Sequence, residues 1–235
     1  MQATSRVTTT ETRELKITTF TTEDRIAATD IVQGSAAWHQ LRLGKVTASR
    51  LSDVMAKGKT GEAATRADYK LDLVIERLTG KPTDSFTNAA MAWGTEQEPF
   101  ARAAYELEKG LFVKEIAFVD HPTILGFGAS PDGLVNDDGC LEIKNPNSKT
   151  HLKYLKDNKP PAKYLNQMIG QLSCTQRDFV DFCSYDSRFP SGLQLFIVRY
   201  YRDEKAIAEI ETEVKKFLEE VEEELALLKQ KMGVK

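Results

Sequence analysis

Residues 130–144 read Ser-Pro-Asp-Gly-Leu-Val-Asn-Asp-Asp-Gly-Cys-Leu-Glu-Ile-Lys, and this stretch decides how the rest of the fold is interpreted. A short apolar run ends at a polar turn, and the residues after the turn alternate between apolar and polar side chains. Such alternation on either side of a glycine-containing turn predicts a β-hairpin. A three-residue loop over 137–139, with Gly139 in the left-handed conformation, is a common connection for such a hairpin.

The register of this hairpin decides whether it builds a site. With the loop at 137–139, Leu134 lies opposite Glu142, and Asp132 lies opposite Lys144. Asp132, Glu142 and Lys144 then share one face, with the Cα atoms of the two acids on a diagonal of roughly 7–8 Å. A slip of one residue would move Asp132 to the other face.

Two carboxylates beside a lysine suit the chemistry of a hard cation. Mg²⁺ prefers oxygen ligands and keeps several waters, so one or two carboxylates suffice. A bound metal can activate water and stabilise charge on a phosphate. The alternative is a surface hairpin with solvated charges. With Ser-Pro-Asp-Gly-Leu placed about ten residues before Glu-Ile-Lys, we favour the site, and the arrangement resembles the PD-(D/E)xK nuclease superfamily.

Composition indicates one globular domain. The chain has 235 residues, of which 41% are hydrophobic and 29% charged, and its formal net charge is −3. Residues 1–30 are rich in threonine and charge with poor hydrophobic periodicity, so we predict a flexible N-terminal arm. We predict that residues 31–235 form a single domain.

The sequence indicates a cytoplasmic protein. No run approaches the roughly 18 apolar residues of a membrane span, and no apolar signal core opens the chain. The three cysteines are odd in number and far apart, which is typical of free thiols.

Hydrophobic periodicity predicts an α/β (α+β-like) fold with a mixed central sheet flanked by helices. We expect helices over 35–42, 50–56, 69–78, 162–174 and 207–228, and strands over 111–113, 116–119, 124–127, 179–185 and 193–201. A further helix is expected to open at Trp93-Gly94 and to bury a stripe that includes Phe100 and Leu107. Residues 95–98 match a helix capping box, so Glu98 taken alone is a structural residue.

Five stretches in order resemble one family, the phage lambda-type exonucleases or YqaJ-like viral recombinase family, whose core is that of the restriction endonucleases. They are Ala37–Ser49 (AWHQLRLGKVTAS), Ala92–Glu98 (AWGTEQE), Ser130–Leu134 (SPDGL), Leu141–Pro146 (LEIKNP) and Tyr164–Gln167 (YLNQ). This resemblance implies a Mg²⁺-dependent exonuclease that digests the 5′ strand of linear double-stranded DNA and leaves a 3′ single strand. It also implies a homotrimer that works with a single-strand annealing protein in recombination. If a phage encodes the chain, the cytoplasm is that of a bacterial host.

The resemblance also implies roles for particular residues. The catalytic set is Asp132, Glu142, Lys144, Glu98 and Gln167. Asp132 and Glu142 are implied to bind two Mg²⁺ ions, for which Mn²⁺ can substitute, together with the Ile143 carbonyl and Glu98. Lys144 is implied to orient water or phosphate.

A second set is implied to bind the terminal 5′ phosphate: Arg42, Ser49 and Ser130. The family's basic loop is represented here only by Lys57 and Lys59. Two other functions remain open, an endonuclease on the same core and a catalytically inactive DNA-binding scaffold, because fold resemblance does not prove function.

Overall fold

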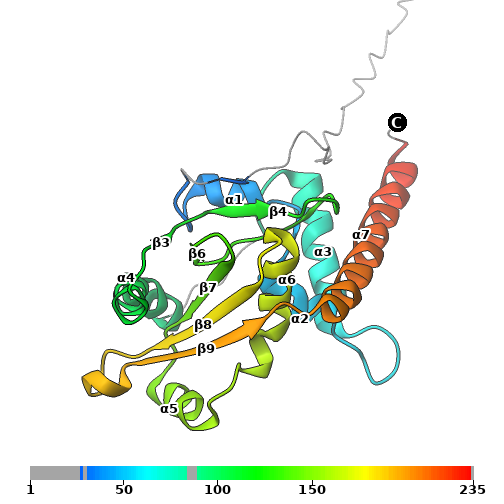
Figure 1. Ribbon diagram of the computed structural model, residues 1–235. Coiled ribbons are helices and arrows are strands. Elements are labelled where there is room, and N and C mark those ends of the chain that lie inside the picture. The colour runs from blue at the N-terminus through cyan, green and yellow to red at the C-terminus, as the bar shows by residue number, and fades with distance from the viewer. Residues whose placement is uncertain (1–26, 29–30, 84–88, 234–235) are drawn as a thin grey trace, which may run out of the picture.

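The computed structural model describes residues 27–28, 31–83 and 89–233. A five-stranded mixed sheet lies at its centre (Figure 1). The strands follow one another across the sheet as β3 (Val113–Lys114), β6 (Gly133–Val135), β7 (Gly139–Lys144), β8 (Phe179–Tyr185) and β9 (Leu195–Tyr201). Strands β7 and β8 are parallel and the other neighbours are antiparallel.

A second, smaller sheet has four strands in the order β1 (Ala27–Ala28), β4 (Phe118–Asp120), β5 (Phe127–Ala129) and β2 (Val46–Thr47). Its strand β1 belongs to the predicted N-terminal arm, and the rest of that arm lies outside the described residues. The predicted mixed sheet is confirmed. Strands β4 and β5 overlap the strands expected over 116–119 and 124–127, but their separation into a second sheet was not predicted. Strands β1 and β2 were not predicted, because strands of two residues give no periodic signal.

Helices cover both faces of the central sheet. The α-helices are α1 (Ala36–Arg42), α2 (Leu51–Val54), α3 (Ala64–Thr79), α4 (Ala89–Lys109), α5 (Ser148–Asp157), α6 (Leu165–Thr175) and α7 (Glu204–Met232). Short 3₁₀ helices are η2 (Ala48–Arg50), η3 (Ala162–Tyr164) and η4 (Ser191–Leu193). Helix α4 packs on one face of the sheet and α6 on the other, and α7 packs against α6 (Figure 1). Helix α5 was not predicted.

Local signals in the sequence explain several helix ends. The Ser35 hydroxyl accepts a hydrogen bond from the Trp38 amide at 3.2 Å and begins α1. Gly80 ends α3 in the left-handed conformation, with a φ of 65°. The buried stripe of α7 is the predicted one and includes Val214, Phe217 and Val221, which supports the prediction of a long amphipathic helix.

The alternation of side chains sorts β7 and β8 into two cores. Cys140, Val180 and Phe182 face the core that contains α6, whereas Leu141 and Cys183 face the core under α4. Glu142 pairs across the ladder with Phe182, so its carboxylate lies on the α6 side.

The hairpin exists, but its predicted register is wrong by two residues. Leu134 pairs with Cys140, not with Glu142, and Gly133 pairs with Leu141. The loop is 136–138, with Asn136 at a φ of 47°. A shift of two residues keeps every side chain on its face. Asp132, Glu142 and Lys144 therefore still share a face, with Asp132 nearer to Glu142 than predicted.

Contacts from distant residues explain the observed loop. Arg177 donates hydrogen bonds to the carbonyls of Val135, Asn136 and Gly139 at 3.3, 2.9 and 2.8 Å. A Cβ atom on Gly139 would lie 2.2 Å from the Phe179 ring, so glycine is required there for packing and not for the turn. Neither contact is visible in the hairpin sequence.

The capping-box interpretation of residues 95–98 is wrong. Helix α4 begins at Ala89 and runs through this segment, with Pro99 inside it. Its buried side chains include Ala101 and Tyr105, whereas Phe100 and Leu107 are 59% and 86% exposed. The apolar residues of α4 do not fall on a single stripe, so the sequence did not show which side faces the sheet.

Two composition-based predictions can be compared with the structure. All three cysteines are buried and unpaired. Among the described helices, none is long and apolar enough to cross a lipid bilayer.

Candidate active site

The hairpin brings two carboxylates and a lysine together. Asp132 lies in a bend directly before β6, and its Oδ2 atom accepts a hydrogen bond from the Ile143 amide at 2.6 Å. Glu142 is fully buried, and its Oε1 atom forms an ion pair with the Lys144 ammonium. The backbone of β7 therefore fixes Asp132 beside Glu142.

Two glutamines on α6 hold the Glu142 carboxylate from the other side. Gln167 donates to Oε1 at 2.6 Å, and Gln171 donates to Oε2 at 2.5 Å. Gln167 was a predicted site residue, whereas Gln171 was not assigned a role. Its position one helical turn after Gln167 was the available signal, because residues i and i+4 share a helix face. With Lys144, three donors fix Glu142.

Asp132 and Glu142 repel each other. Burial, followed by the Glu142 charge, raises the pKa of Asp132 well above its usual value, and Lys144 only partly opposes this rise. A shifted carboxyl in such a pair is typical of a functional site.

Lys144 is held as a cation. Burial alone would lower its pKa, but the charges of Glu142 and Asp132 outweigh burial and raise the pKa above its usual value. Lys144 also lies over the Tyr164 ring, with its Nζ atom 5.2 Å from the ring centroid. Such a lysine suits charge stabilisation and not proton abstraction near neutral pH.

Glu98 lies at the edge of this cluster. Its carboxylate pairs with Arg102 of the same helix at 2.8 Å. Burial raises the pKa of Glu98, and the charge of Glu98 adds to the rise in the pKa of Asp132. Glu98 is thus close enough to act on Asp132 electrostatically while it is bound to Arg102.

The donor set fits a hard divalent cation. Asp132 and Glu142 offer carboxylate oxygens, and a cation would relieve the repulsion that raises the pKa of Asp132. Within residues 27–28, 31–83 and 89–233, no group of three or more His, Cys, Asp or Glu side chains is placed to hold a metal ion. Any metal site would therefore rest mainly on these two acids.

A second cluster lies beside the first, because Ser130 is only two residues before Asp132. Arg42, at the end of α1, points its NH1 atom to the Ser130 hydroxyl at 3.4 Å and its NH2 atom to the Ser49 hydroxyl at 3.5 Å. Its guanidinium lies over the Trp38 ring, 4.0 Å from the centroid. The three predicted phosphate-binding residues are therefore brought together.

Arg42 carries a charge that its neighbours balance only in part, through the charge of Glu76. In the described part of the chain it forms no ion pair. Burial lowers the pKa of Arg42 to about 10. Its two contacts with hydroxyl groups are long for hydrogen bonds. A half-buried guanidinium with weak neutral partners is suited to binding an anion.

Residues of the 33–42 segment hold the backbone before Asp132. Gln33 donates from its side-chain amide to the carbonyls of Ile116 and Pro131 at 2.8 and 2.9 Å. The Trp38 indole donates to the Ala117 carbonyl and to the Ser130 hydroxyl, both at 3.0 Å. Sequence reasoning gave neither residue this role. The spacing of Trp38 and Arg42, one helical turn, was a usable signal.

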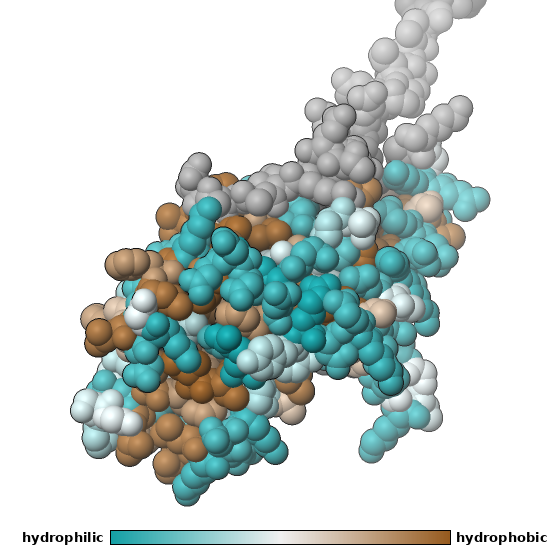
Figure 2. Space-filling model, in the orientation of Figure 1, coloured by the Kyte–Doolittle hydropathy of each residue, from teal (hydrophilic) through white to brown (hydrophobic). Residues whose placement is uncertain are grey.

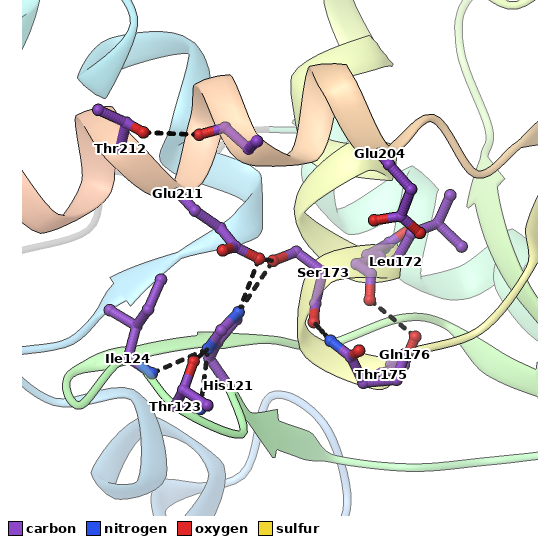
Figure 3. A network of polar contacts seen from close by, with 12 residues as sticks. His121, Thr123, Ile124, Leu172, Ser173, Thr175, Gln176, Glu204, Glu211 and Thr212 are labelled. Atoms are coloured by element: carbon purple, nitrogen blue, oxygen red, sulfur yellow. Dashed lines mark hydrogen bonds and ion pairs between the residues drawn. The ribbon is translucent and has the colours of Figure 1, made fainter.

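A third polar cluster has the composition of a Ser-His-Glu triad but not its geometry (Figure 3). The His121 Nδ1 atom accepts hydrogen bonds from the Thr123 and Ile124 amides, so its Nε2 atom carries the proton. That atom faces Ser173 at 3.0 Å and Glu211 at 3.2 Å. The histidine cannot deprotonate this serine, so the cluster joins the β4–β5 connection to α6 and α7 and does not act as a nucleophile.

Comparisons with known proteins identify the family of this chain. A family model described as the YqaJ-like viral recombinase domain matches residues 37–178. Crystal structures of LHK-Exo, an alkaline exonuclease from Laribacter hongkongensis, include one in complex with dAMP. They match with 51% sequence identity and a TM-score of 0.80, over 85% of this chain and 98% of that chain.

A phage-related exonuclease from Haemophilus somnus 129PT shares the fold at 16% identity, with a TM-score of 0.56 over 77% of this chain and 96% of that chain. A comparison with curated proteins found no match. The family match spans more than half of the sequence and includes both clusters of the site. The chain belongs to the YqaJ-like viral recombinase domain family.

Proposed function

We propose that this chain is a Mg²⁺-dependent exonuclease that digests the 5′ strand of linear duplex DNA and leaves a 3′ single strand for recombination. Its family and its 51% identity to an alkaline exonuclease support a nuclease that acts on DNA. The metal, the direction of digestion and the end product are parts of our proposal.

One observation carries the proposal: Arg42, which forms no ion pair among the described residues, contacts the segment that also carries Asp132. Ser130 contacts Arg42, and Asp132 follows two residues later. A terminal phosphate held by Arg42 would therefore lie close to the carboxylates. The dAMP bound to the alkaline exonuclease LHK-Exo is a nucleotide of the kind that digestion from a DNA end releases.

The residues of this chain divide the chemistry between them. Arg42, with Ser49 and Ser130, would bind the terminal phosphate through charge-assisted hydrogen bonds. Lys144 would stabilise charge on the phosphate that is cleaved or orient the attacking water. Gln167 keeps the Glu142 carboxylate in a fixed position.

Asp132 and Glu142 would hold the Mg²⁺, with the Ile143 carbonyl and Glu98 as the further ligands of our proposal. A bound divalent cation supplies a water of lowered pKa and stabilises the leaving oxygen. Mn²⁺ should substitute, because it also takes oxygen ligands. Gln167 and Lys144 would keep Glu142 in place when the metal is absent.

End-labelled linear duplex tests the proposal directly. The chain should release a 5′-terminal label as mononucleotide in Mg²⁺ but not in EDTA, and it should leave supercoiled closed DNA intact. Cutting of the closed circle would favour the endonuclease alternative. No cleavage of any DNA in Mg²⁺ or Mn²⁺ would favour the inactive scaffold.

The role of Arg42 has its own test. Hydrogen bonds to charged groups contribute roughly 1.5–3 kcal/mol, so Arg42→Ala should weaken the use of 5′-phosphorylated ends by about 10- to 100-fold. Arg50→Ala is a matched control, because Arg50 also lies over an aromatic ring, 4.1 Å from the Tyr69 centroid, but pairs with Asp53. Equal losses on phosphate and hydroxyl ends would contradict phosphate binding by Arg42.

We also propose a closed homo-oligomer, most simply a trimer, that hands its single strand to an annealing protein. An exposed apolar patch supports self-association: Phe100, Leu107 and Phe112 are 59%, 86% and 91% exposed. Hydrophobic side chains are visible at the edge of the molecule over α4 (Figure 2). Sedimentation of Leu107→Ser with Phe112→Ser should show a lighter species than the wild type.

A further inference from the structure

A lysine-rich segment follows β7 and includes α5 and η3. Residues 149–163 hold five lysines and one acid, Asp157, in a chain of net charge −3. The lysines are Lys149, Lys153, Lys156, Lys159 and Lys163, and all five are exposed. This short segment therefore carries a local excess of positive charge, whereas a uniformly acidic surface would repel DNA.

Burial of two side chains orients these lysines. His151 is fully buried between the Ser184 hydroxyl at 2.8 Å and the Leu193 carbonyl at 2.9 Å. Tyr154 is 5% exposed and packs edge-on against Phe182. Because α5 is anchored on that side, the side chains one turn apart at 149, 153 and 156 form a stripe facing solvent.

These lysines differ in their pairing from the basic side chains of α3 that face α7. Arg66 and Lys70 both pair with Glu220, and Arg77 pairs with Glu222. In the part of the chain that the structure describes, none of the five lysines at 149–163 forms an ion pair. Their charge is therefore available to an external anion.

The lysine segment borders the candidate active site. The Tyr164 ring lies between the two regions, with its centroid 4.5 Å from the Lys163 Nζ atom and 5.2 Å from the Lys144 Nζ atom. Gln167, which holds Glu142, follows three residues later. A polymer whose end occupies the site can thus continue across η3 and α5.

We propose that the lysines of 149–163 bind the phosphodiester backbone of the DNA whose end is in the active site. The ligand is a regularly spaced row of phosphates, which flexible, unpaired lysines bind as point charges without reading sequence. This inference rests on the DNA substrate of the proposed function and adds the surface that holds it.

The salt dependence of binding tests the proposal. Lys153→Gln, Lys156→Gln and Lys159→Gln are combined, and a short blunt duplex with a 5′ phosphate is titrated by fluorescence anisotropy in EDTA. Each lysine that neutralises a phosphate contributes about 0.9 to the slope of log K against log salt, so the slope should fall by about 2–3. Glutamine keeps the helix propensity of lysine, and thermal melts should be unchanged.

A matched control removes equal charge elsewhere. Lys215, Lys216 and Lys231 are exposed on α7, which lies on the opposite side of the molecule from α5 (Figure 1). Changing these three to glutamine should leave the slope near that of the wild type. A slope that falls equally in both triple variants would overturn the proposal, since it would reflect net charge alone. An unchanged slope in the α5 variant would also overturn it.

The same titration with single-stranded DNA identifies the source of the phosphates. A slope change with duplex alone supports binding of the duplex, and a change with the single strand alone supports binding of the product strand. Because binding is measured in EDTA, it does not depend on cleavage. If the wild type digests DNA while the α5 variant keeps the wild-type salt slope, the proposed role of the lysines is wrong and the proposed exonuclease activity stands. If the wild type digests no DNA while the salt slope of the α5 variant falls, the lysines bind DNA and the proposed exonuclease activity is wrong.

Discussion

Two sets of buried charges lie on opposite faces of the central sheet. On the α4 face, the fully buried Asp181 accepts hydrogen bonds from Tyr105 at 2.7 Å and from Arg199 at 2.8 and 2.9 Å. On the α6 face, Asp132 and Glu142 share one cation, Lys144. The first set is balanced in charge, and the second carries an excess negative charge.

This difference separates structure from function. The Asp181 set joins α4 to β8 and β9, and every charge in it has a partner. The Asp132 set and the cluster of Arg42, Ser49 and Ser130 each leave charge that the protein itself does not fully neutralise, one negative and one positive. Buried charge without a partner costs stability, so its presence at two neighbouring points indicates sites shaped for a cation and an anion.

The largest expected effect is the loss of cleavage when the negative charge is removed. Asp132→Asn or Glu142→Gln should reduce the rate by more than the roughly 10²–10³-fold typical of one lost electrostatic contact, because each acid would bind the metal mainly by charge. Mononucleotide release in Mg²⁺ measures it, and circular dichroism checks the fold. Near-normal turnover by Asp132→Asn would remove it from the site.

Lys144→Ala should have the next largest effect, a loss of about 10²–10³-fold in the chemical step. The Nζ atom of Lys144 lies beside Glu142 and over Tyr164, where its charge can act on a phosphate. Single-turnover rates at saturating DNA report this step, and anisotropy in EDTA reports binding. A change in affinity with an unchanged single-turnover rate would make Lys144 a phosphate clamp only.

Asp181→Asn should have the opposite profile. It removes the charge that pairs with Arg199, which lies on the Phe179 ring, 3.4 Å from its centroid. Breaking a buried ion pair from one side costs about 3–5 kcal/mol, and the 35% exposure of Arg199 places the expected loss near the lower end. Urea melts measure the loss. Cleavage per folded molecule should remain near normal, and a selective loss of cleavage would break the comparison.

The sequence was sufficient for one of these sets and not for the other. Alternation in 130–144 predicted that Asp132, Glu142 and Lys144 share a face. The exact register depends on Arg177 and Phe179, which are about forty residues away along the chain. The pattern of residues within the hairpin therefore cannot predict it. The sequence indicated a role for Asp181 in one way only: a carboxylate inside an apolar strand must have a polar partner when it is buried. Its partners, on α4 and β9, could come only from the fold.

Other site residues show the same limit. Gln167 and Gln171 could be paired from helical spacing, but only the packing of α6 against β7 brings both to Glu142. Gly170, between these two glutamines, permits close packing of α6 on α2, because a Cβ atom there would lie 2.3 Å from Leu51. Gln33 gave no signal, since its partners are backbone carbonyls of residues 116 and 131.

The smallest expected effect is a gain of stability when Asp132 is neutralised without metal. A carboxyl whose pKa is raised by folding binds its proton more tightly in the native state, so it stabilises the fold at pH below its unfolded pKa. That stability is lost as pH rises through the raised native pKa. At pH 8 in EDTA, Asp132 therefore opposes folding, because the native state must either bury its charge beside Glu142 or take up a proton from solution.

Asp132→Asn removes the charge that opposes folding and keeps a side-chain oxygen that can accept the hydrogen bond from the Ile143 amide. Its melting temperature in EDTA should exceed that of the wild type at pH 8, and the difference should shrink as the pH falls. A gain of 1 kcal/mol corresponds to about 2–4 °C for a domain of this size, which thermal melts resolve. Lower stability of Asp132→Asn at pH 8 would mean that Asp132 is compensated as Asp181 is, and the contrast between the two faces would no longer hold.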